Sequence, residues 1–189
     1  MRKFSVRPAI TIKGRKFKGL RGWAGKPTHP PLTDVPIGAY VMAAAFDVVS
    51  VVAGDTHSWA RDLWHAGTFA VIAGVVVSVF AALTGLVDRQ QSSEAGTQAR
   101  RTINTHAAIM VAVTVLAILN MVLRLNAYNT ALVTPVGIMV LSVVVAVLVA
   151  WGSTYGGSLV FDYGFNVETA GDHPVWHQSE TDVFPGDDH

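Results

Sequence analysis

The chain has 189 residues, of which 51% are hydrophobic and only 14% are charged, and it contains no cysteine. Together with a positive mean hydropathy, this composition is typical of a membrane protein. The lack of cysteine excludes disulfides, a cysteine-ligated iron–sulfur cluster, covalently attached haem and a thiol nucleophile within this chain.

The formal net charge of +1 conceals a separation of charge between the two ends of the chain. Residues 1–26 contain nine Lys or Arg and no acid, whereas residues 152–189 contain seven acids and no Lys or Arg. Basic segments beside membrane helices remain in the cytoplasm. We therefore predict a basic cytoplasmic N-terminal tail over residues 1–28 and an acidic cytoplasmic C-terminal tail over residues 156–189.

The first membrane span is expected within a proline-rich and then apolar stretch, residues 29–49. Thr33 or Asp34 is a suitable N-cap residue. The apolar run over residues 35–54 is about 20 residues and therefore about 30 Å long, enough to cross a bilayer. Asp47 lies inside this run, where an isolated charge is costly, so we predict that it pairs with another residue or takes part in function.

The second span is predicted over residues 64–87, where small side chains recur at every fourth position. These are Ala66, Ala70, Gly74, Ser78 and Ala82. Such a row lets another membrane helix approach closely. The following loop carries three arginines, Arg89, Arg100 and Arg101, and two spans return the chain to the side of its basic N-terminus, so the predicted topology is self-consistent.

The third and fourth spans are predicted over residues 105–125 and 132–151. The third carries one stripe of residues at helical spacing: His106, Met110, Val113, Ala117, Asn120 and Arg124. Beyond the fourth span, residues 158–167 are rich in β-branched and aromatic residues and are expected to form a short strand or a docked loop. The predicted fold is an all-α, integral membrane four-helix bundle over residues 29–155 with extramembrane N- and C-terminal tails.

Two histidines are expected at the same depth, near the cytoplasmic ends of the first and third spans. In an up-and-down bundle these helices can lie diagonally, which is the arrangement that offers two axial nitrogens to a b-type haem. His29 and His106 are thus candidate haem-iron ligands. The simpler alternative is that His29 bonds within its loop and that His106 caps its helix or pairs with Asp88.

A second group of polar residues is expected in the opposite half of the membrane. Asp47, His65, Asn120 and Arg124 lie at comparable depth in the predicted spans. The cluster is either a structural pairing that neutralises Asp47 or part of a proton or quinone site. The sequence leaves both alternatives open.

Other motifs carry little chemistry. His173 and His177 have a metal-ligand spacing, but Pro174 lies between them and two histidines are too few for a metal site. No phosphate-binding loop or catalytic triad is present, and the basic tail lacks a nucleic-acid-binding fold, so we expect neither a stand-alone enzyme nor a nucleic-acid partner.

Several pieces of the sequence, in this order, resemble a known family. They are HPPLTDVPIGAY at residues 29–40, Asp47, ALTGLVD at 82–88, Arg100 and Arg101 with the following His106 and Ala107, and GGSLVFDYGF at 156–165. Together they resemble the bacterial four-helix membrane domain called domain of unknown function 2231, which also occurs fused to Rieske-type iron–sulfur domains. The resemblance implies that the protein lies in a bacterial cytoplasmic membrane and that its partners are redox proteins.

These observations lead to two functional hypotheses. In the first, the chain is a membrane subunit of a bacterial respiratory or electron-transfer complex that carries a b-type haem or lines a quinone site. Its partners are then membrane lipids and the other subunits of the complex, an iron–sulfur protein among them. In the second, the chain is a non-catalytic accessory subunit that binds partners through its oppositely charged tails.

Overall fold

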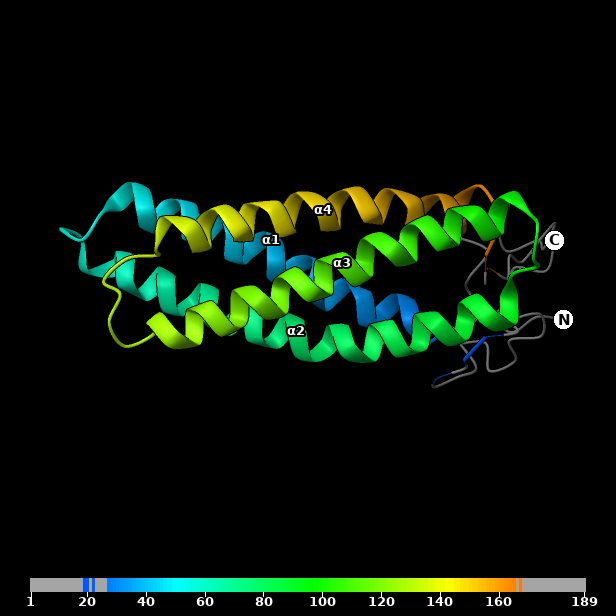
Figure 1. Ribbon diagram of the computed structural model, residues 1–189, viewed down its shortest axis with the longest axis horizontal. Coiled ribbons are helices and arrows are strands. Elements are labelled where there is room, and N and C mark those ends of the chain that lie inside the picture. Colours follow the sequence, from blue (N-terminus) through cyan, green and yellow to red (C-terminus); the bar gives the residue numbers. More distant parts are fainter. Residues whose placement is uncertain (1–18, 21, 23–26, 166, 168–189) are drawn as a thin grey trace, which may run out of the picture.

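The computed structural model describes residues 19, 20, 22, 27–165 and 167. These residues form four helices and no strand: α1 (His29–Ala53), α2 (Ser58–Ser92), α3 (Gln98–Ala127) and α4 (Val136–Phe161). The helices run up and down in one elongated bundle (Figure 1). The predicted all-α four-helix fold is confirmed.

The two ends of the bundle differ in the connections they carry. The α1–α2 and α3–α4 connections lie at one end, which we call the hairpin end (Figure 1). The α2–α3 connection lies at the other end, where α1 begins and α4 ends, and we call this the terminal end. α1 and α3 each pack against both α2 and α4. Consequently α1 and α3 lie diagonally opposite each other, as the cofactor hypothesis requires.

The distribution of side chains is the reverse of that in a water-soluble protein. Phe69, Phe80 and Leu83 are more than half exposed on the outside, whereas Asp47 and Arg124 are fully buried. All four helices are long and apolar enough to cross a membrane. An apolar exterior around an interior that holds buried charges is stable where lipid replaces water, so the protein is a membrane protein with four spans.

The observed helices are longer than the predicted spans. α1 begins at His29 because the two prolines that follow occupy its first turn, where no N–H donor is needed. Thr33 therefore lies inside the helix, and its hydroxyl donates to the Pro30 carbonyl (2.7 Å) instead of capping the helix. At the other end of the chain, α4 continues to Phe161, so the expected strand or loop over residues 158–167 is wrong for its first four residues.

Both predicted tails fall largely outside the described residues. The basic residues 1–18 and the acidic residues 168–189 belong to this part of the chain, as do His173 and His177. The expectations for these segments therefore stay predictions.

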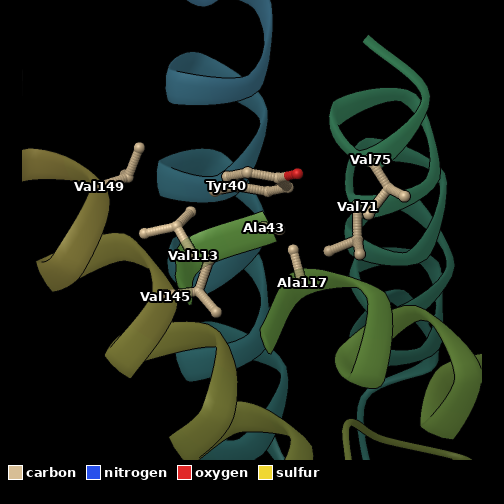
Figure 2. Close-up of a cluster of buried hydrophobic side chains, with 8 residues drawn as sticks. All are labelled: Tyr40, Ala43, Val71, Val75, Val113, Ala117, Val145 and Val149. Carbon is tan, nitrogen blue, oxygen red and sulfur yellow. The ribbon is translucent and has the colours of Figure 1, made fainter. Parts of the chain in front are cut away.

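The centre of the bundle is organised around the ring of Tyr40. This ring extends from α1 across the core, with its hydroxyl pointing towards α2 (Figure 2). There it shares a 2.8 Å hydrogen bond with Ser78. A methyl group added at Gly74 would lie 2.6 Å from a Tyr40 ring carbon. The predicted row of small residues on α2 thus makes room for an aromatic side chain. The surrounding core consists of Ala43, Val71, Val75, Val113, Ala117, Val145 and Val149.

This packing predicts that Gly74→Ala destabilises the bundle. The new methyl group overlaps a buried ring that a hydrogen bond holds in place, and overpacking of this kind costs about 1–3 kcal/mol. Thermal unfolding in detergent, followed by circular dichroism, measures the effect. The matched control is Gly137→Ala, where a methyl group meets no atom within 4 Å. Equal melting temperatures for the two variants would contradict the proposed packing.

Candidate functional site

A cavity of about 390 Å³ occupies the terminal half of the bundle and is lined by all four helices. Its walls are mainly aliphatic, and Tyr40 and Ser78 line it at the depth of the core. Its lining also includes the exposed residues Leu86, Val111 and Phe161, so the cavity reaches the surface of the bundle. Among the described residues, four charged or titratable side chains other than tyrosine contribute to the lining: His29, Asp88, Arg89 and His106.

His29, the first residue of α1, is held against α2. Its Nδ1 lies 2.9 Å from the carbonyl oxygen of Ala81. Because a carbonyl only accepts, Nδ1–H is the donor, and Nε2 of the neutral ring keeps its free lone pair. The ring packs on Gly85, where a methyl group would lie 2.7 Å from His29 Cε1. The same Nδ1 also lies 3.3 Å from the hydroxyl oxygen of Thr84, so α2 fixes the ring through two polar contacts and one close packing contact.

His106 on α3 is held against α4 in the same way. Its Nδ1–H donates to the carbonyl oxygen of Gly152 over 2.9 Å, which again leaves Nε2 with a free lone pair. Its ring packs on Gly156, where a methyl group would lie 3.1 Å from His106 Cε1. Neither simpler alternative holds, since His29 bonds to α2 and His106 bonds to α4 rather than to Asp88.

The two histidines occupy equivalent positions in two similar hairpins. In each hairpin, the residue whose carbonyl accepts the histidine hydrogen bond is followed four positions later by the glycine under the ring. These pairs are Ala81 with Gly85 and Gly152 with Gly156. The matching contacts indicate an approximate two-fold relation between the two hairpins, a relation known from repeats in membrane proteins. Both imidazoles line the same cavity.

The same relation extends to a buried ion pair towards the hairpin end. Asp47 follows His29 by the 18 residues that also separate Arg124 from His106. At 1.5 Å per residue, the ion pair lies about 27 Å along the bundle from the histidines. Arg124 Nη2 donates to Asp47 Oδ2, and both side chains are fully buried.

Neutral residues complete the ion-pair network. Arg124 Nε donates to Asn120 Oδ1 (2.6 Å), and Nη2 also donates to the hydroxyl of Ser142 (3.0 Å). The hydroxyl of Thr134 donates to Asp47 Oδ1 (3.0 Å). The guanidinium also lies over the ring of Trp64, 4.9 Å from its centroid. Both charges are thus compensated within the protein, as a buried pair requires.

The structure brings together three of the four residues of the predicted polar cluster. Asp47, Asn120 and Arg124 are in contact, whereas His65 stacks on Tyr128 with 4.5 Å between ring centroids. Its Nε2 lies 3.4 Å from the Tyr128 carbonyl oxygen. The network also includes Thr134, Ser142 and Trp64, which no sequence pattern indicated. Depth in the membrane related His65 to the other three residues, and depth alone does not identify which residues of a helix face inward.

The fold and the cavity together define a four-span membrane protein with an internal ligand-sized pocket. The model of the DUF2231 family, described as a predicted membrane protein, matches residues 25–169. The chain therefore belongs to this family, and all four helices lie within the match. No curated protein and no solved structure matches the chain.

The ion-pair network predicts that Asp47→Ala strongly destabilises the bundle. The substitution leaves Arg124 buried without a counter-charge, which costs about 3–5 kcal/mol. The double variant Asp47→Leu/Arg124→Met removes both charges and should recover most of this loss. Thermal unfolding in detergent compares the two. If the double variant were no more stable than Asp47→Ala, charge compensation would not be the source of the effect.

Proposed function

We propose that this chain is an electron-transfer subunit of a bacterial membrane redox complex and holds a b-type haem between His29 and His106. The observation that carries the proposal is the equivalent setting of the two imidazoles. They come from diagonal helices, line one cavity, and each directs its Nδ1–H to a main-chain carbonyl of the next helix.

The residues present fit a ligand of this kind. Metal-bound histidines regularly donate their second ring N–H to a carbonyl, which fixes the ring and raises the basicity of the ligating nitrogen. His29 and His106 both meet this condition. Gly85 and Gly156 let the adjacent helices close on the rings, and the largely aliphatic cavity suits the apolar faces of a porphyrin.

The ligand set favours electron transfer over catalysis. A bound haem supplies one-electron chemistry. His29 and His106 would both hold the iron, so neither would be left to act on a substrate. The resemblance to domains fused with Rieske proteins suggests an iron–sulfur protein as redox partner.

The charges of the described residues favour a cytoplasmic position for the terminal end. Arg89, Arg100 and Arg101 lie at or beside the α2–α3 connection. Within the described segments, Arg61 and Arg124 lie beside the two hairpin connections, and only Arg61 is exposed, because Arg124 is buried in its ion pair. Under the positive-inside rule, the terminal end with its cavity is then cytoplasmic. We accordingly propose that the protein lies in the bacterial cytoplasmic membrane and that both tails are on the cytoplasmic side.

A quinone is the second candidate for the same cavity. The hydroxyl groups of Tyr40 and Ser78 lie at the cavity, and the free Nε2 atoms accept hydrogen bonds from quinol hydroxyls. The accessory-subunit hypothesis differs from both because it assigns the cavity no ligand.

The first test is the reduced-minus-oxidised absorption spectrum of the purified, haem-supplied protein. We expect the bands of a low-spin, bis-histidine b-type haem, and we expect His29→Leu and His106→Leu each to abolish them because one axial ligand is lost. His57→Leu serves as the control, since His57 is exposed at the hairpin end and bonds to the Ala53 carbonyl.

Two outcomes of this experiment count against the haem. One is a folded wild-type protein without the spectrum, and the other is a spectrum that survives loss of either histidine. In the first case, binding of a quinone analogue to wild type but not to the Tyr40→Phe variant would support the quinone site instead.

A further prediction concerns the glycine beneath His29. Gly85→Ala places a methyl group 2.7 Å from the ring and forces it to shift, so we expect weaker haem binding and partial loss of the low-spin signal. Haem titration and electron paramagnetic resonance measure both effects. Gly38→Ala is the matched control on α1, because a methyl group there meets no atom within 4 Å. Identical titrations for the two variants would argue against contact between Gly85 and a ligating ring.

A further inference from the structure

Among the described residues one arginine lines the cavity towards the terminal end, and its partners are incomplete. Arg89 lines the cavity and is half-buried. Its Nε donates to Asn104 Oδ1 over 2.8 Å. Within the part of the chain that the structure describes, its two terminal nitrogens donate to no protein acceptor. The guanidinium is thus held by one edge while the other edge is free.

The position of Arg89 relative to the histidines is set by α2. Gly85 lies under the His29 ring, and Arg89 follows it by four residues, about 6 Å further towards the terminal end. Its main chain is held in place as well, because Arg100 Nη1 donates to the Arg89 carbonyl oxygen (2.6 Å). Arg89 is therefore a fixed positive charge one helical turn outside the level of the imidazoles.

A guanidinium with a free edge at the mouth of an apolar cavity suits a planar anion. Arginine binds carboxylates with two parallel hydrogen bonds, and this pairing is stronger where water is partly excluded. Asp88, the other charged residue of the lining besides the histidines, accepts a 2.8 Å hydrogen bond from the Leu20 main-chain N–H. It bears the opposite charge and offers no attraction to an anion.

We infer that Arg89 binds a free carboxylate at the edge of the cavity ligand, so that the site selects a tetrapyrrole with unesterified acid groups. The inference rests on the proposed function, since it assumes that a porphyrin lies between His29 and His106. It adds a binding residue outside the axial ligands and an orientation, with the acid edge towards the terminal end.

Selection for the carboxylate is tested by titrating the purified full chain, freed of haem, with protohaem and with protohaem dimethyl ester. A charge-assisted hydrogen bond contributes about 1.5–3 kcal/mol, so wild type should bind protohaem roughly 10-fold to 100-fold more tightly than the ester. Arg89→Gln should bind both porphyrins with similar affinity. Arg89→Lys should keep part of the preference, because it retains the charge but not the two-pronged geometry.

Arg101→Gln is the matched control. Arg101 lies at the same end of the bundle, is exposed and does not line the cavity, so its loss changes the net charge equally. This variant should retain the full preference of wild type for protohaem. Circular dichroism of each variant before titration shows that the helical content is unchanged.

The outcomes separate this inference from the proposed function. If wild type binds neither porphyrin, the haem proposal fails and the inference fails with it. If wild type binds both porphyrins equally, or Arg89→Gln keeps the preference for protohaem, only the role of Arg89 is overturned. The midpoint potential offers a second readout, since loss of a positive charge beside the haem should lower it in Arg89→Gln and not in Arg101→Gln.

Discussion

The buried ion pair between Asp47 and Arg124 sets the register of the whole bundle. It joins α1 to α3 across the diagonal, where these two helices make little other contact. Each partner lies 18 residues from a histidine on its own helix, so the pairing brings His29 and His106 to the same level at the terminal end. A slip of one helix by a turn would separate the charges in a medium of low dielectric constant, which is strongly disfavoured.

Different side chains fill the interior in the two halves of the bundle. Towards the hairpin end, the ion pair and its neutral hydrogen-bonding partners fill the interior. Tyr40 closes the centre, where Gly74 admits its ring and Ser78 binds its hydroxyl. Beyond Tyr40 the interior is lined mainly by aliphatic side chains, and both imidazoles bond to a neighbouring helix. The cavity is therefore the space left where the histidines are tied to the walls.

Much of this arrangement can be predicted from the sequence, because a membrane imposes simple rules. Four apolar runs predict four spans, the lone Asp47 predicts a partner, and equal depth relates His29 to His106. The spacing of 18 residues from His29 to Asp47 and from His106 to Arg124 is visible in the sequence. It places Arg124 at the depth of Asp47 and so predicts that the two residues pair.

The remaining features depend on how neighbouring helices are rotated and aligned. Whether Gly85 or another residue of α2 meets a histidine is fixed by the packing of both helices, which no local pattern encodes. His65 illustrates the limit: it is adjacent in sequence to buried Trp64, yet it lies about 100° further around the helix and meets Tyr128. The continuation of α4 to Phe161 similarly depends on packing, since Gly156 fits against His106.

The approximate two-fold relation holds at the histidines but breaks at the mouth of the cavity. Gly85 corresponds to Gly156, so the position that corresponds to Arg89 is Val160, which also lines the cavity. A flat ligand between the two imidazoles would meet an equivalent ring on each face, yet among the described lining residues only Arg89 would offer a cation to its outer edge. Symmetry is thus present where two equal bonds to one metal ion are proposed. It is absent at the outer edge, where Arg89 is a partly exposed cation and Val160 is apolar.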